Sequence, residues 1–174
     1  MYHKRVSNKA VLLLGSNLGD RLAHLSFACE ELKKSGIEIA VKSNHYETEA
    51  WGFSGGAFIN QAIVVETTLL PLQLLDLTQN IEQKSGRTSH NHESAYESRT
   101  LDVDILFFND QIIENERLMV PHPKIHIRRF ALEPLNEICA SYKHPVLMKT
   151  IEELKDECPD GSVVTEIPPI ISEK

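Results

Sequence analysis

The order in which strand-like and helix-like hydrophobic patterns follow one another is the feature that most limits the fold of this chain. A strand shows a short apolar run or an alternation, whereas an amphipathic helix shows apolar residues three or four apart. Six such segments follow one another along the chain. They are a strand at residues 9–14, a helix at 20–36, two strands at 37–46 and 58–67, a helix at 71–86 and a strand at 101–108. This order predicts an α+β fold, the ferredoxin-like βαββαβ arrangement, in which two helices cover one face of a four-stranded sheet.

Residues at the ends of the two helical segments support these boundaries. Asp20 is suited to cap the first helix, which ends at Lys33-Lys34-Ser35-Gly36 with cations and a glycine. Pro71 suits the first turn of the second helix, and Gly86 ends it. We therefore expect both helices to begin and end at these residues.

The rest of the chain is expected to add to this core within a single domain. Asn109-Asp110 predicts a turn from strand 101–108 into Ile112 and Ile113, the other arm of a hairpin. From Arg128 the pattern predicts a helical segment, with Pro134 interrupting it. A length of 174 residues suits one domain over residues 1–174, with residues 1–8 and about 160–174 as tails.

Charge and cysteine content argue against several classes of protein. The chain has 18 Lys and Arg against 25 Asp and Glu, a net charge of −7, so it has no overall electrostatic support for binding nucleic acid or an anionic membrane. Cys29, Cys139 and Cys158 are widely spaced, which indicates neither a disulfide framework nor a zinc site. No export signal or membrane helix is evident. We expect a cytoplasmic monomer with no nucleic-acid or membrane partner.

The segment from Arg99 to Leu106 is the most informative for chemistry. Asp102 and Asp104 alternate with apolar residues, so both point to one face of a strand, with Cα atoms about 6.6 Å apart. Two like charges on one face repel, and a divalent cation would compensate them. Magnesium accepts one or two carboxylates together with phosphate oxygens, which suits a nucleotide-using site. The alternative is a solvated strand face that happens to carry two aspartates.

Arginine is concentrated in the same part of the sequence. Five of the seven arginines follow the second helix: Arg87, Arg99, Arg117, Arg128 and Arg129. The arginine fork binds phosphate through two hydrogen bonds, and it accompanies metal-binding carboxylates in phosphoryl-transfer sites. Surface ion pairs, each contributing little, are the alternative interpretation.

Three further segments carry weaker signals. His122 lies between Pro121 and Pro123, which fix its backbone and suit it to donate to a phosphate, although His122 taken singly favours a structural role over a catalytic one. Residues 15–20 link a strand to a helix, as a phosphate loop does, but lack the Gly-Lys-Ser/Thr ending of a P-loop. A transition-metal site built from residues 90–93, which include two histidines and a glutamate, has no support from a periodic pattern.

Taken together and in order, several motifs resemble one known family. These motifs are Gly15-Ser16-Asn17-Leu18-Gly19, Tyr46 with Thr48, Phe58-Ile59-Asn60, Ile81-Glu82 with Gly86-Arg87, Arg99 to Leu106, Val120-Pro121-His122-Pro123 and Arg128-Arg129-Phe130. From about Lys9 to Ile138 the chain resembles 6-hydroxymethyl-7,8-dihydropterin pyrophosphokinase, an enzyme of folate biosynthesis. The resemblance implies a ferredoxin-like fold and transfer of a diphosphate from ATP to the pterin hydroxymethyl group, with release of AMP.

The resemblance also implies roles for individual residues. Two magnesium ions would be held by Asp102 and Asp104, which together with Arg87 and Arg99 form the implied catalytic set. The implied ATP-binding residues are Gln79, Glu82, Arg87, Arg99, Arg117, His122 and Arg128. The implied pterin-binding residues are Thr48, Phe58, Asn60, Tyr96 and Phe130, of which Phe58 and Phe130 would sandwich the ring. In this family the loop at residues 15–20 lies near the substrates and does not serve as a P-loop.

The chain departs from the family pattern before Arg99. Many relatives have Arg-Trp-Gly-Pro there, whereas this chain has Ala95-Tyr96-Glu97-Ser98. Tyr96 is still able to close over a ring, but Glu97 adds a negative charge near the expected triphosphate. These departures keep open the alternative of a nucleotide- or pterin-binding regulatory domain without turnover. An RNA-binding module of the same fold is a further alternative, although such a sheet should carry stacking aromatic residues where Asp102 and Asp104 stand.

Overall fold

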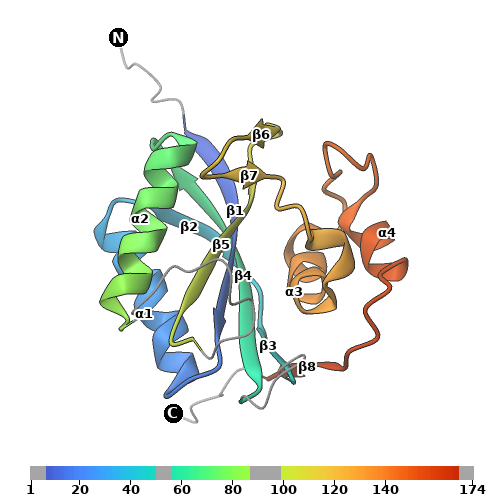
Figure 1. Cartoon of the computed structure of the whole chain (residues 1–174), viewed down its shortest axis with the longest axis horizontal. Helices are drawn as coiled ribbons and strands as arrows, with labels where there is room; N and C mark the ends of the chain where they lie inside the picture. The colour runs from blue at the N-terminus through green and yellow to red at the C-terminus, as the bar shows by residue number, and fades with distance from the viewer. Residues whose placement is uncertain (1–6, 50–55, 87–98, 169–174) are drawn as a thin grey trace.

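The structure is a computed structural model that describes residues 7–49, 56–86 and 99–168 (Figure 1). Its strands are β1 (Asn8–Ser16), β2 (Glu38–Lys42), β3 (His45–Thr48), β4 (Phe58–Thr67), β5 (Asp102–Phe108), β6 (Ile113–Glu114), β7 (Met119–Val120) and β8 (Val164–Ile167). Its helices are α1 (Arg21–Lys34), α2 (Pro71–Lys84), α3 (Arg129–Cys139) and α4 (Ile151–Asp156), with a 3-10 turn at Ile125–Ile127. The main sheet has the antiparallel order β5-β1-β4-β3-β8, and β2 pairs with β4.

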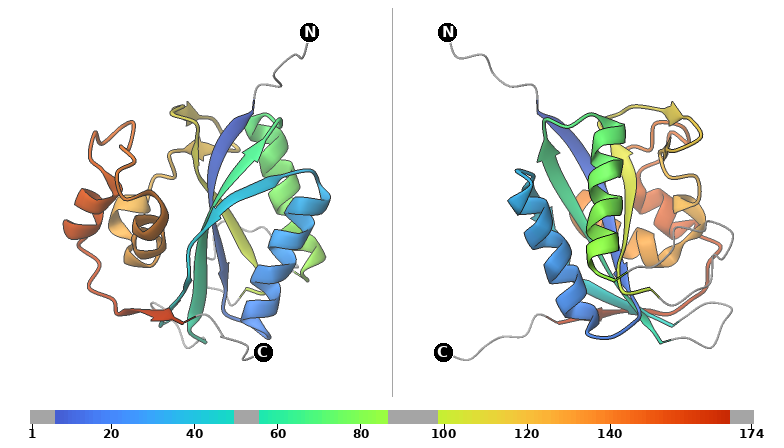
Figure 2. Two further views of the ribbon diagram at one scale, coloured as in Figure 1. Left: turned by 180° about the vertical axis from the view of Figure 1, so that it is seen from behind. Right: turned by 60° about the vertical axis from the view of Figure 1, so that its left-hand side comes forward.

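Strand β1 is buried on both faces because its side chains alternate between two hydrophobic cores. Ala10, Leu12 and Leu14 pack with residues of α1 and α2. Val11 and Leu13 pack with residues of α3 and α4. The expected layer of two helices on one face of the sheet is confirmed, and the C-terminal helices form a second layer on the opposite face (Figures 1 and 2).

The ends of α1 and α2 form as their sequences predict. The side chain of Asp20 accepts a hydrogen bond of 3.0 Å from the backbone N–H of Ala23 and caps α1. Gly36, with φ of 79°, ends that helix in the left-handed region, where glycine avoids the steric cost of a Cβ atom. Pro71 is the first residue of α2, where its missing N–H costs no helical hydrogen bond.

The single strand expected over residues 37–46 is divided in two. Strands β2 and β3 both pair with β4, one after the other along the same edge. Ser43 lies between them, and its hydroxyl accepts a hydrogen bond of 3.0 Å from the backbone N–H of Ala62. Its carbonyl oxygen accepts another, of 2.8 Å, from the side chain of Gln61. The side chains of Ser43 and Gln61 therefore take part in the hydrogen bonding at the junction between the two strands.

A turn at Asn109-Asp110 and an added hairpin follow strand 101–108 as expected, but the predicted arms are wrong. Ile113 pairs with Val120, so β6 and β7 form a small separate sheet. Asn109 ends β5 with φ of 49°, and its side chain accepts a hydrogen bond of 2.8 Å from the backbone N–H of Lys9. The side chain of Asn115 then closes the β6–β7 turn by accepting hydrogen bonds from two backbone N–H groups. The bonds of Asn115 are local side-chain bonds, of the kind that compete with a hairpin ladder.

The expected interruption at Pro134 is also wrong, since α3 continues through this residue to Cys139. A proline inside a helix removes one hydrogen bond and costs about 3 kcal/mol. Pro134 is buried, as are Ala131, Leu132 and Leu135 of the same helix. Because burial of a leucine side chain contributes roughly 1.5–3 kcal/mol, the packing of α3 against the sheet offsets the proline.

The C-terminal part of the chain is more ordered than a tail. Strand β8 lies within the segment expected as a tail and pairs with β3, with Val164 opposite Thr48. Lys143 and Thr150 form an isolated antiparallel bridge before α4. None of the helices in the described residues has the length and apolar character that crossing a membrane requires.

Candidate active site

A row of paired residues crosses three strands near the end of β1 and defines the candidate site. Gly15 of β1 lies opposite Asp102 of β5 on one side and opposite Asn60 of β4 on the other. Asn60 in turn lies opposite Tyr46 of β3. Because neighbouring strands are about 4.8 Å apart, Asp102 and Asn60 are separated by roughly 10 Å across the sheet. This spacing separates a carboxylate end of the candidate site from an amide end.

The two aspartates lie on the face of the sheet that α3 covers. Asp104 pairs with Leu13, whose side chain packs in the core beneath α3. Val103 and Ile105 point the other way, into the core beneath α1 and α2. The alternation predicted from the sequence therefore places both carboxylates on one face of the sheet, the face that also carries Asn60.

Arg99 compensates the charge of Asp102. Its Nη1 atom lies 3.1 Å from both carboxylate oxygens of Asp102, and the side chains of Arg99 and Asp102 are only 22 and 23% exposed. The guanidinium of Arg99 and the carboxylate of Asp102 thus form a partly buried charged group at the start of β5, with Asp104 two residues further along the same face. Oppositely charged groups at this depth attract more strongly than on the surface, because water screens them less.

Residues of β3 and β4 form the other end of the site. Thr48 pairs with Phe58, and Asn60 is only 4% exposed. The hydroxyl of Thr48 is buried and, among the residues that the structure describes, has no hydrogen-bond partner. A Cβ atom on Gly15 would lie 2.9 Å from Oδ1 of Asn60, so glycine leaves room for the Asn60 amide. Buried amide and hydroxyl groups of this kind are able to recognise the hydrogen-bonding edge of a heterocycle.

Glu82 of α2 reaches the free edge of β5. Its Oε1 atom accepts a hydrogen bond of 2.7 Å from the backbone N–H of Val103, and its side chain is buried. This bond fixes the part of β5 that carries the two aspartates. Gln79 lies one turn earlier on α2 and is half-buried. Both residues lie on the opposite side of the sheet from α3, and their implied contacts with ATP stay a prediction.

His122 and Arg128 approach the charged group from the segment that leads into α3. The Nδ1 atom of His122 accepts a hydrogen bond of 3.2 Å from the backbone N–H of Lys124, so the neutral ring carries its proton on Nε2. Burial and the positive charge of Arg128 lower the pKa of His122 to about 4, while Asp102 acts in the opposite direction. At neutral pH His122 is therefore a hydrogen-bond donor without charge. The guanidinium of Arg128 lies 5.6 Å from the ring centre of Phe130.

We expect the imidazole of His122 to protonate near pH 4 in the folded protein, well below its usual 6.5. Since the folded state binds this proton more weakly than the unfolded chain, His122 lowers the stability of the fold as pH falls from 6.5 towards 4. A histidine NMR titration measures the pKa directly. The Arg128→Ala substitution should raise it, because a positive charge is removed, whereas Arg128→Lys should leave it low. A parent pKa near 6.5 would contradict this assignment.

Two of the remaining sequence candidates are placed differently, and others are not described. Among the described residues, the ion-pair partner of Arg117 is Asp76 of α2, in an exposed pair, and no contact joins Arg117 to the two aspartates. Arg129 binds Glu133 of its own helix. Arg87, Tyr96 and the histidines of residues 90–93 lie outside the described residues.

Asn17 is a site residue whose role the sequence did not reveal. Its Oδ1 atom accepts a hydrogen bond of 2.6 Å from the backbone N–H of Arg99, and the backbone N–H of Asn17 donates one of 3.1 Å to the Arg99 carbonyl. Its side chain also donates to the carbonyl of Gly56 at 3.3 Å. Asn17 therefore holds the backbone that carries Arg99. The only signal in the sequence was the asparagine of the Gly15-Ser16-Asn17 motif, which reads as an ordinary turn residue.

The donor set fits magnesium better than a transition metal. Within the described parts of the chain, no group of three or more His, Cys, Asp or Glu side chains is arranged to hold a metal ion. Asp102 and Asp104 supply hard carboxylate oxygens on one face, and magnesium commonly binds one or two carboxylates and fills its other positions with phosphate oxygens and water.

Comparisons with known proteins agree with this geometry. The sequence model described as 7,8-dihydro-6-hydroxymethylpterin-pyrophosphokinase matches residues 11–140. A 2-amino-4-hydroxy-6-hydroxymethyldihydropteridine pyrophosphokinase of Bacillus subtilis is 43% identical over 77% of this chain and 80% of the relative. A protein of the same name from Aquifex aeolicus is 38% identical over 83% of this chain and 88% of the relative.

Solved structures show the same fold. A Plasmodium falciparum HPPK-DHPS structure superposes with a TM-score of 0.69 over 90% of this chain, at 19% sequence identity. The present chain spans 46% of that Plasmodium chain. At this identity the likeness concerns the fold, and it agrees with the ferredoxin-like arrangement predicted from the order of elements.

Proposed function

The chain belongs to the 7,8-dihydro-6-hydroxymethylpterin-pyrophosphokinase family, and on this premise we propose that the residues gathered beneath α3 form its active site. The protein is an ATP-dependent pyrophosphokinase of folate biosynthesis, which transfers a diphosphate group from ATP to 6-hydroxymethyl-7,8-dihydropterin and releases AMP. One observation supports the location of the site above all: the register that places Asp102, Gly15 and Asn60 side by side across the sheet.

The phosphate end of the site comprises the charged group at the start of β5. Asp102 and Asp104 would hold magnesium, for which we propose two ions. Magnesium bound there would neutralise phosphate charge and polarise the transferred group. Arg99 and Arg128, together with the Nε2–H of His122, are the donors for the phosphate oxygens. We assign Arg87, Arg117, Gln79 and Glu82 to the ATP side as well, on the basis of the family resemblance.

The pterin end of the site comprises Thr48, Phe58, Asn60 and Phe130, with Tyr96 assigned from the family resemblance. The buried hydroxyl of Thr48 and the amide of Asn60 are available to the polar edge of the ring. Phe58 and Phe130 are suited to the two faces of a flat heterocycle. This division places the hydroxymethyl group between the pterin end and the carboxylates.

The transfer is an in-line displacement. The hydroxymethyl oxygen forms a bond to the β-phosphorus of ATP, the bond from that phosphorus to the oxygen bridging it to the α-phosphate breaks, and AMP leaves with the electron pair. The hydroxyl proton is released. Positioning of the two substrates and stabilisation of the developing charge supply most of the acceleration. Arg99 contributes to both, because it meets phosphate charge while holding Asp102.

We further propose that the enzyme acts as a monomer in a reducing compartment such as the cytoplasm. Its three cysteines are free, and Cys29 is buried in the core beneath α1 and α2. Free cysteines are usual where thiols are kept reduced.

Pterin-dependent release of AMP tests the activity directly. The purified protein is incubated with ATP, magnesium and 6-hydroxymethyl-7,8-dihydropterin, and AMP is measured by a coupled assay with and without the pterin. We expect AMP to form only when all three are present. Binding of ATP and pterin without AMP release would instead identify a regulatory domain of the same fold. Omission of magnesium is the matched control for the carboxylate site.

A further inference from the structure

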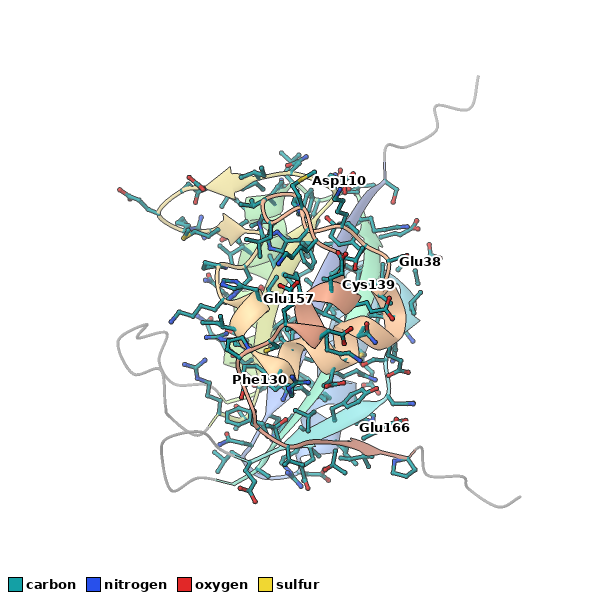
Figure 3. All side chains as sticks on the ribbon, turned by 90° about the vertical axis from the view of Figure 1, so that its right-hand side faces the viewer. Glu38, Asp110, Phe130, Cys139, Glu157 and Glu166 are labelled. Carbon is teal, nitrogen blue, oxygen red and sulfur yellow. The ribbon has the colours of Figure 1, made fainter. Side chains whose placement is uncertain are left out.

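The part of the chain after residue 140 lies beyond the family match, yet it contacts two elements of the proposed site. It comprises α4, strand β8 and the segments that join them. Figure 3 shows this segment running from the region of Glu157 past Phe130 towards Glu166. Helix α4 packs against α3, and the part of the chain after α4 contacts the first turn of α3 and pairs with β3.

The first contact supplies the cap that α3 lacks. Arg128 occupies the cap position but makes no side-chain capping bond, and the first turn of α3 contains no acidic residue. Instead, Oδ2 of Asp160 accepts a hydrogen bond of 2.9 Å from the backbone N–H of Arg129, while its carbonyl accepts one of 2.8 Å from Nε of Arg129. A carboxylate at this end is favourable, because the free N–H groups of a helix carry partial positive charge there.

Asp160 is itself held in place. Its Oδ1 atom accepts a hydrogen bond of 3.0 Å from the backbone N–H of Ser162 and another from the Ser162 hydroxyl. Partial burial by itself would raise the pKa of Asp160, but the bonds from Ser162 and Arg129 outweigh burial and lower it. The carboxylate therefore stays ionised at neutral pH and oriented towards α3.

The second contact holds β3. Strand β8 pairs with all four residues of β3, and Val164 lies opposite Thr48. The side chain of Asn44, next to β3, donates a hydrogen bond of 2.6 Å to Glu166. Helix α3, which covers this face of the sheet, also contacts β3: Glu137 accepts a hydrogen bond of 2.9 Å from the hydroxyl of Tyr46. Strand β3 is thus fixed both by β8 and by α3.

We infer that the part of the chain from Asp160 to the end of β8 acts as a positioning brace for the pterin end of the site, with Asp160 as the residue that contacts α3. Asp160 fixes the first turn of α3, which carries Phe130, and β8 fixes the strand that carries Thr48. This inference rests on the proposed function, in which Phe130 and Thr48 contact the pterin. Small displacements of groups that orient a substrate have large effects on binding and rate, so a brace outside the site is able to control substrate affinity.

The Asp160→Ala substitution tests the brace. We measure the Kd of the pterin by calorimetry in the presence of a non-hydrolysable ATP analogue and magnesium, and the Kd of the analogue alone. Loss of a helix cap allows the first turn of α3 to fray, and we expect the pterin Kd to rise about tenfold. Asp160→Asn keeps a neutral oxygen as acceptor, so it should recover most of the affinity.

Thr150→Ala is the matched control for a general loss of stability. Thr150 caps α4 in the same segment, by a reciprocal pair of bonds with Glu153, but contacts neither α3 nor β3 through them. We expect a similar fall in melting temperature with the pterin Kd unchanged within about twofold. An equal rise of the pterin Kd in Thr150→Ala and Asp160→Ala, or no rise in Asp160→Ala, would overturn the brace.

The Phe130→Ala substitution shows whether the inference about the brace or the proposed function itself is wrong. A raised pterin Kd in Phe130→Ala together with parent affinity in Asp160→Ala rejects the brace alone. Parent affinity in Phe130→Ala shows that the pterin binds elsewhere, and it rejects both the proposed site and the brace.

Discussion

Replacing Asp102 or Asp104 with asparagine is expected to lower kcat by at least about 10²–10³, the loss usually seen when one preorganised stabilising group is removed. Asparagine keeps the shape of the side chain but carries no charge, so it binds magnesium weakly and no longer balances the surrounding guanidinium groups. The effect should be on turnover more than on folding, because both side chains lie at the sheet surface beneath α3 and not among the apolar residues of the core.

Steady-state kinetics at several magnesium concentrations measure this effect. The magnesium concentration needed for half-maximal rate should rise in both variants. Asp156→Asn is the control, since Asp156 is an exposed acidic residue at the end of α4. Near-parent turnover in a folded Asp102→Asn or Asp104→Asn protein would remove the basis for the proposed metal site.

The second large effect is expected for Arg99→Ala, with a fall in kcat of about 10² or more and the fold preserved. Alanine removes the group proposed to meet the transferring phosphates, and it also removes the guanidinium that binds both carboxylate oxygens of Asp102. Arg99→Lys restores the charge but not the planar fork, so it should recover only part of the rate.

Circular-dichroism melts and kinetics on the same preparations distinguish catalysis from folding. Lys149→Ala serves as the control, because it removes an exposed ion pair with Glu157 far along the chain from β5. Exposed pairs of this kind contribute about 0–1 kcal/mol. An Arg99→Ala protein with both the melting temperature and the rate of the parent would refute the role of Arg99.

The charges around Asp102 suit a neutral ring for the proposed phosphate contact of His122. Arg99 and Arg128 already supply positive charge, and a third cation in the same partly buried volume would be repelled. Burial and Arg128 together keep the pKa of His122 low, so in the proposed site its Nε2–H would donate to a phosphate oxygen without adding charge. The fixed direction of this bond follows from the backbone N–H of Lys124, which occupies Nδ1.

Features that depend on neighbouring residues could be predicted from the sequence. The Asp20 cap of α1, the place of Pro71 in the first turn of α2, the glycines that end both helices and the shared face of Asp102 and Asp104 all follow from local backbone geometry. The family resemblance added candidate residues that no spacing rule identifies, such as Thr48 and Phe130. The structure places Thr48, Asn60 and Asp102 on the same face of the sheet.

Predictions that depended on competition between distant partners failed. The predicted arms of the hairpin after Asn109 were wrong because the side chain of this residue binds Lys9, about a hundred residues earlier. The break at Pro134 was wrong because burial of the apolar face of α3 outweighs one lost hydrogen bond. Neither the sequence around Asn109 nor that around Pro134 contains the partner that decides the outcome.

What the sequence by itself determined is the order of the strands and helices of the βαββαβ core and the chemical groups available to them. Only the tertiary structure decided which groups meet: Asp102 beside Gly15 and Asn60, Asn17 on Arg99, and Asp160 at the first turn of α3. The physical reason is that strand register and helix docking are set by burial and hydrogen bonding summed over the whole sheet. No single stretch of the sequence includes all the residues that make these contacts.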